Sequence, residues 1–248
     1  MKKLLYPLAL WIAIAPMASL DAVPLHVFLG GGVPAGGGGG GGATYLLEEN
    51  FEATGSPGYD TSTWTESGTP DENASTSGLS LQGSECLQIN ASATTVNTTS
   101  PTFTAQSTAY AYFLLRFSAL PSGGTWTLFQ FRHSGGECAR IRVTATGALS
   151  IRAGGGTDVA TSSTMSTGTT YHIWMKYVKG SGSNAVVEAG FSTDGTRPTS
   201  GGTFATQTAG TATTDTDRIM FGQASSNTVN MYADKVRVDD AVIGDNPS

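Results

Sequence analysis

The feature that most constrains the fold is a succession of short apolar runs from Tyr45 almost to the C-terminus. Most runs alternate apolar and polar residues with a period of two, the pattern of a strand with one buried face. Glycine-rich turns separate them, for example at Gly123-Gly124 and Gly154 to Gly156. No stretch keeps a helical period over three turns. About eleven strands at this spacing predict an all-β fold, a single antiparallel β-sandwich of the jelly-roll type.

The composition narrows the class of protein and its partners. Charged residues make up 13% of the 248 residues, about half the usual share. Few charges with much Thr, Ser and Gly are typical of a secreted or surface-exposed β protein. The formal net charge of −6 argues against nucleic acid as a partner, because phosphate binding requires a basic surface.

The N-terminal segment differs from the rest of the chain. In residues 1–22, Lys2 and Lys3 precede an apolar run, the pattern of a secretory signal peptide. The alternative is an apolar arm that docks onto a neighbouring subunit or particle. Residues 23–43 contain seven consecutive glycines and predict a flexible linker. We therefore expect a jelly-roll domain at 44–248 that is secreted or at the cell surface, or alternatively on a virion.

The two cysteines, Cys86 and Cys138, each open a β-like run. An even number of cysteines in an exported chain permits one disulfide, here between neighbouring strands. The alternative is two buried free thiols.

Three runs, 126–132, 139–145 and 170–178, define which side chains share a face. If they belong to one sheet, alternation places a polar and aromatic set on its outer face: Trp126, Gln130, Arg132, Arg140, Arg142, His172 and Trp174. Flat tryptophan rings with Arg and Gln suit an acidic glycan. The alternative is that the tryptophans belong to the core and the arginines keep a solvated sheet soluble.

The last run, 231–244, carries an anomaly. Asp234 falls on the same face as Tyr232, Val236 and Val238. A carboxylate there needs a partner, because burying an unpaired charge is very costly. The run LLEENFEATG at 46–55 also predicts a strand with an acidic end. We expect these first and last strands to lie side by side.

Several motifs carry a resemblance to a known family. The run ENFEATG followed by Trp64, and the run YADKVRVDD, look like the paired first and last strands of concanavalin A-like (laminin-G-like) jelly rolls. The stretch YHIWMKYVKGSGSNAV resembles their central hairpin, and similar domains occur in environmental bacteria and tailed-phage surface proteins. The resemblance implies a structural Ca²⁺ held by Glu52 and Asp234 together with backbone oxygens. The alternative is that Asp234 lies at a rim and pairs with an arginine or with water.

The same superfamily includes lectins, adhesion domains, glucanases and polysaccharide lyases, so the fold does not choose a function. The chain lacks the closely spaced acids on one strand that retaining glycoside hydrolysis uses in this fold. Lyase motifs are not evident either, although Arg140, Arg142, His133 and Tyr112 supply the residue types. We therefore expect a non-catalytic carbohydrate-binding or adhesion domain with a surface polysaccharide as partner. The alternatives are a structural subunit that self-assembles through its N-terminal arm and, third, a polysaccharide lyase or glucanase.

Overall fold

The structure is a computed structural model that describes residues 45–52, 64–68, 80–91, 96–222 and 228–247. In these ranges the chain forms fourteen strands and no helix, so none of the described residues lies in a helix that could cross a membrane. The strands make two antiparallel seven-stranded sheets, as the predicted β-sandwich requires. The predicted leader (1–22) and linker (23–43) lie outside the described residues.

Sheet A contains both terminal strands. Its strands in spatial order are β1 (Leu47–Glu49), β14 (Val229–Asp239), β5 (Thr108–Ala119), β10 (Thr170–Val178), β11 (Ala185–Ser192) and β12 (Phe204–Gly210), and β3 (Leu87–Ala91) also pairs with β14. The pairing of Leu47 with Val238 and of Glu49 with Val236 confirms that the first and last strands lie side by side.

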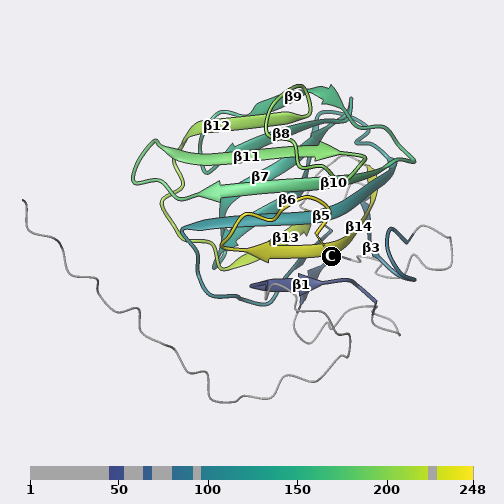
Figure 1. The fold of residues 1–248 in the computed structure, drawn as a ribbon, viewed down its shortest axis with the longest axis horizontal. Helices are drawn as coiled ribbons and strands as arrows, with labels where there is room; N and C mark the ends of the chain where they lie inside the picture. The colour runs from purple at the N-terminus through teal and green to yellow at the C-terminus, as the bar shows by residue number, and fades with distance from the viewer. Residues whose placement is uncertain (1–44, 53–63, 69–79, 92–95, 223–227, 248) are drawn as a thin grey trace, which may run out of the picture. The chain divides into compact units, whose positions relative to one another are not determined.

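Sheet B lies behind sheet A in Figure 1. Its strands in spatial order are β2 (Thr65–Ser67), β4 (Asn97–Thr99), β13 (Arg218–Gly222), β6 (Thr125–His133), β7 (Gly136–Thr144), β8 (Ala148–Ala153) and β9 (Val159–Thr164). Three strands were not expected from the sequence: β2, β9 and β12. All three are edge strands, which bury little side-chain surface and therefore lack a clear apolar alternation.

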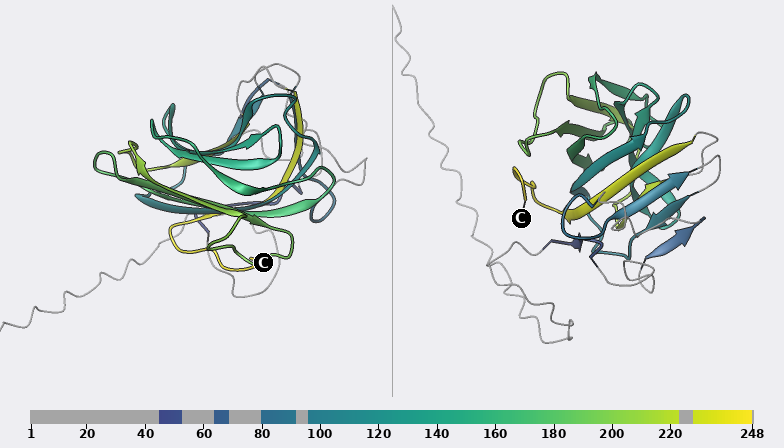
Figure 2. Two further views of the ribbon diagram at one scale, coloured as in Figure 1. Left: turned by 90° about the horizontal axis from the view of Figure 1, so that it is seen from above. Right: turned by 90° about the vertical axis from the view of Figure 1, so that its right-hand side faces the viewer.

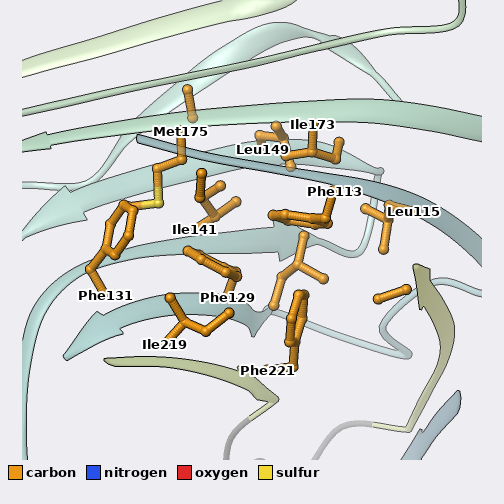
Figure 3. Packing of buried hydrophobic residues seen from close by; sticks show 14 of the residues in the cluster. Phe113, Leu115, Phe129, Phe131, Ile141, Leu149, Ile173, Met175, Ile219 and Phe221 are labelled. Carbon is orange, nitrogen blue, oxygen red and sulfur yellow. The ribbon is translucent and has the colours of Figure 1, made fainter. Parts of the chain in front are cut away.

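The core lies between the two sheets (Figure 3). Phe113 from sheet A stacks on Phe129 from sheet B, with ring centroids 5.0 Å apart. Phe221 meets both rings edge-on at 5.2 Å. The predicted alternation in β7 and β10 is confirmed, because Ile141 and Ile173 are fully buried in this core.

Two β-bulges change which side chains face this core. In β6 the register shifts between Thr127 and Phe129, and Trp126 is consequently inside the sandwich and fully buried. In β14 the register shifts between Asp234 and Arg237, where Lys235 has a φ of 50°. A bulge adds one residue to one strand, so alternation reverses its phase beyond it.

Because of the bulge in β14, the expected position of Asp234 on the same face as Val236 and Val238 is wrong. Before the bulge the core side chains are Met231 and Ala233, and after it they are Val236 and Val238. Asp234 therefore does not share the inward face with Val236 and Val238. Its side chain lies on the outer side of sheet A, where it is nonetheless fully buried.

The outer faces of the two sheets differ in what covers them. The C-terminal segment crosses sheet A, where Trp174 Nε1 donates to the Gly244 carbonyl at 3.2 Å and Ile243 packs beside Tyr112 and Leu114. In the left view of Figure 2 this segment lies on the outer side of sheet A, and sheet B curves so that its outer face is the concave side.

Candidate functional site

Five arginines gather on the outer face of sheet B. They come from four neighbouring strands: Arg132 on β6, Arg140 and Arg142 on β7, Arg152 on β8, and Arg218 on β13. The chain has only thirteen Lys and Arg residues. We call this set the arginine face. It gathers positive charge in a protein whose formal net charge is −6.

Strand register explains this clustering. Arg140 lies opposite Arg152 across β7 and β8, and Arg132 lies opposite Arg218 across β6 and β13. The core-facing neighbours, such as Phe131 and Ile151, fix the pleat and leave the arginines on the other side. Directly opposed like charges repel, so such a ladder needs counter-ions.

Two carboxylates supply those counter-ions. Glu137 lies 3.3 Å from Arg140 and 3.7 Å from Arg152. Asp158, on the turn between β8 and β9, lies 3.1 Å from Arg142, 3.7 Å from Arg140 and 3.9 Å from Arg152. Three guanidinium groups thus share two carboxylates. Burial lowers the pKa of Arg140, and the charge of Glu137 opposes that effect.

A second group of polar side chains lies where β6 turns into β7. His133 Nδ1 is 3.1 Å from an oxygen of Asp217, whose other oxygen accepts a hydrogen bond from Arg218 Nε at 2.8 Å. Burial of Asp217 raises its pKa, but hydrogen bonds and charge from Arg218, with the charge of His133, lower it overall. The ionised Asp217 holds the imidazole by Nδ1, which leaves Nε2 as the nitrogen available to a ligand.

Arg132 adjoins this group and is held in place by two acceptors. Its Nη1 donates to Gln130 Oε1 at 2.5 Å, and its Nη2 donates to the Gly135 carbonyl. Gln130 itself is fully buried on the floor of the face. We therefore assign Gln130 the task of positioning Arg132. Arg132 and His133 are consecutive residues at the end of β6, so a cation that can neutralise a carboxylate and an imidazole that can accept a proton both occur there.

The outer face of sheet A carries a different cluster. Tyr112 Oη is 2.8 Å from His172 Nδ1, and the His172 ring stacks on Trp174 with centroids 5.9 Å apart. Burial raises the pKa of Tyr112 and, with the charge of Lys235, lowers that of His172, so both are neutral at pH 7. Tyr112 is fully buried beneath Trp174 and Ile243. Tyr112 is therefore part of a packed layer, whereas His172 beside it is only partly buried.

The structure brings together four of the six predicted carbohydrate-binding residues: Gln130, Arg132, Arg140 and Arg142. The other two were wrongly placed. Trp126 is in the core because of the bulge in β6, and Trp174 is on sheet A, because β10 does not belong to the same sheet as β6 and β7. Sequence reasoning missed Arg152 and Arg218. For Arg152 the signal was present, because it alternates with the apolar Leu149 and Ile151.

The predicted disulfide is wrong in this structure. Cys86 precedes β3 in sheet A, whereas Cys138 is on β7 in sheet B, and both are buried free thiols. The expected pairing required neighbouring strands, and these two strands belong to different sheets. Burial raises the pKa of Cys86 to about 12 and also raises that of Cys138, so both remain protonated.

The predicted calcium ligands, Glu52 and Asp234, hold the same loop. Glu52 accepts hydrogen bonds from the backbone and side chain of Ser84, and Asp234 accepts the Gln82 N–H at 2.8 Å. Backbone amides therefore already engage both carboxylates, and no group of three acidic, His or Cys side chains suited to a metal occurs among the described residues. Calcium stays a prediction. An unchanged melting temperature in chelator and in added Ca²⁺ would contradict it.

Comparison with known proteins supports the fold. No family model matches the sequence, and no curated protein matches it. Among solved structures, an endo-β-1,4-glucuronan lyase from the fungus Trichoderma reesei has a TM-score of 0.58 at 14% identity and covers 83% of this chain and 99% of its own. A marine alginate lyase from Aplysia kurodai has a TM-score of 0.55 at 10% identity, covering 79% and 99%. A further alginate lyase has a TM-score of 0.50 at 13% identity, covering 78% and 96%.

These likenesses correct the expected function. The chain shares its β-sandwich with enzymes that cleave polysaccharides, over almost their whole length. The expectation of a non-catalytic binding or adhesion domain is therefore not supported. The alternative of a subunit that self-assembles through its N-terminal arm concerns residues outside the described ranges and is not tested. The three structures named above include no phage protein, so the resemblance drawn to tailed-phage domains stays an expectation.

Proposed function

We propose that this chain is a polysaccharide lyase that cleaves an acidic polysaccharide on the arginine face. The observation that carries the proposal is the placement of five arginines on one face of sheet B, with the His133–Asp217 pair linked to them through the contact of Asp217 with Arg218. A uronate polymer has one carboxylate on each sugar, and such a face would bind it. The fold shared with a glucuronan lyase and two alginate lyases supports the same reaction class.

The reaction would be a β-elimination. Removing the proton at C5 of a uronate sends its electron pair into a new C4–C5 double bond. The C4–O4 bond of the same uronate breaks, and the O4 oxygen leaves with the neighbouring sugar. The C5 proton is acidic enough only when the adjacent carboxylate is neutralised. Arg132, which Gln130 holds by a hydrogen bond, would make this contact through a charge-assisted pair.

His133 is the base that we assign to this step. Its side chain is 45% exposed, and Asp217 fixes Nδ1, so Nε2 can accept the C5 proton. The resulting imidazolium can then give a proton to the departing oxygen, which balances the reaction. Asp217 acts as a positioning residue, because its contact with the imidazole sets the ring orientation.

The direct test is to mix the full chain with polyglucuronate or alginate and to follow the ultraviolet absorbance of the unsaturated uronate product. We expect His133→Gln to reduce kcat by about 10²-fold or more, the usual contribution of a general base. His172→Gln is the matched control, since it removes a histidine from the opposite sheet. Folded wild-type protein that forms no unsaturated product from either polymer would overturn the proposal.

The proposal includes a location and a partner. We infer that the chain acts outside the cell, where acidic polysaccharides are accessible, and that residues 1–22 direct its export. Its partner would then be the polysaccharide itself.

A further inference from the structure

Asp158 occupies an unusual position on the arginine face. It is the residue before β9, and its carboxylate approaches three guanidinium groups, those of Arg140, Arg142 and Arg152. Its side chain is 35% exposed, more than that of any of these arginines. Asp158 therefore lies toward the solvent side of the cluster, the side from which a polymer would approach.

Glu137 completes the arrangement from the more buried side. It is 19% exposed and contacts Arg140 and Arg152, two of the three arginines that Asp158 contacts. The four side chains form a closed ring of alternating charge, with Arg142 attached through Asp158 at 3.1 Å. Three cations and two anions leave one positive charge to attract a substrate.

The arginines in this ring are not saturated by protein acceptors. The Nε atoms of Arg140, Arg142 and Arg152 are buried and have no hydrogen-bond partner among the described residues. Glu137 is needed to keep the buried Arg140 charge compensated, because Arg140 is only 9% exposed. Without Asp158, Glu137 would still pair with Arg140 and Arg152, and Arg142 would lose its carboxylate.

We propose that Asp158 is a specificity-determining residue that limits the charge density of the polymer this face accepts. This inference rests on the proposed function. With Asp158 ionised, the face matches a polymer with one carboxylate on each sugar. A densely sulfated polymer places more negative charge beside Asp158 and is repelled. Without that carboxylate, the same arginines would favour the sulfated polymer.

The test compares binding of two named probes, polyglucuronate and dextran sulfate, by the full chain and its variants. We expect Asp158→Asn to bind dextran sulfate about tenfold more tightly, while its affinity for polyglucuronate changes much less. Asn keeps the size of the side chain and an oxygen acceptor for Arg142. Asp158→Glu keeps the charge and is expected to retain the wild-type preference.

Asp240→Asn is the matched control, because it removes the same charge from an exposed site after β14 on sheet A. An equal shift in this control would mean that net charge alone sets the preference, and it would overturn the inference. So would an Asp158→Asn protein whose preference is unchanged, even if the wild type cleaves polyglucuronate. Wild-type protein that binds neither probe would remove the proposed function and this inference together.

Discussion

At the scale of single residues, Asp234 is the clearest departure from ordinary behaviour. Its carboxylate is fully buried and accepts the N–H groups of Gln82 at 2.8 Å and Lys235 at 2.6 Å. Burial raises its pKa to about 7, although these hydrogen bonds oppose the shift, and the charge of Glu52 raises the pKa further. The ordinary pKa of this carboxyl, 3.8, applies to the unfolded chain. Between about pH 4 and pH 7 the folded protein therefore keeps a proton on Asp234 that the unfolded chain has released.

The sign of the resulting pH dependence follows from linkage. Because the folded state binds the proton more tightly, the contribution to stability is complete below about pH 4 and is lost as pH rises toward 7. We expect the free energy of unfolding of the wild type to fall by about 2–4 kcal/mol more than that of Asp234→Asn over this range. Urea denaturation at a series of pH values, with chelator present, measures this difference. Parallel pH profiles for the two proteins would contradict it.

At the scale of elements, β-bulges decided which sequence predictions succeeded. Alternation correctly placed Arg140 and Arg142 outward and Ile141 inward, because β7 is regular across those positions. It failed at Trp126 and Asp234, each of which is separated from the regular part of its strand by a bulge. The extra residue of a bulge cannot be recognised from the residue types. Beyond it, strict alternation therefore assigns each side chain to the wrong face of the sheet. The sequence also does not show which strands share a sheet. His172 and Trp174 alternate as predicted, but β10 belongs to sheet A and not to the sheet of β6 and β7.

The bulge in β14 makes its own prediction about Lys235. This residue has a φ of 50°, in the left-handed region that glycine adopts without strain. Alanine and glycine both remove the buried stem of the lysine, so their difference isolates the backbone. We expect Lys235→Gly to be more stable than Lys235→Ala by about 1 kcal/mol, the reverse of the usual order in a strand. Thermal denaturation of the pair checks this, and an alanine variant at least as stable as the glycine variant would refute it.

At the scale of the whole molecule, charge is segregated rather than uniform. The formal net charge of −6 suggested only that nucleic acid was an improbable partner, and it concealed a positive face. The arginine face could not be assembled from the sequence, because Arg132 and Arg218 are 86 positions apart and meet only through the pairing of β6 with β13. Individual outward arginines were predictable from local alternation. The number of arginines that gather on one face was not predictable, because it depends on which strands share a sheet.

This segregation predicts how salt affects substrate binding, and two models give opposite signs. If net charge governed the encounter, salt would screen a repulsion and lower the KM for polyglucuronate. If the arginine face governs it, contacts within a few ångströms of the polymer weaken as the screening length falls from ~10 Å at 0.1 M salt to ~3 Å at 1 M, and KM rises. We expect the second result.

Arg152→Gln should reduce the slope of log KM against log salt by roughly one. Lys176→Gln, which removes a cation paired with Glu188 on sheet A, should leave that slope unchanged. A KM that falls with salt, or equal slopes for both variants, would show that the polymer binds elsewhere.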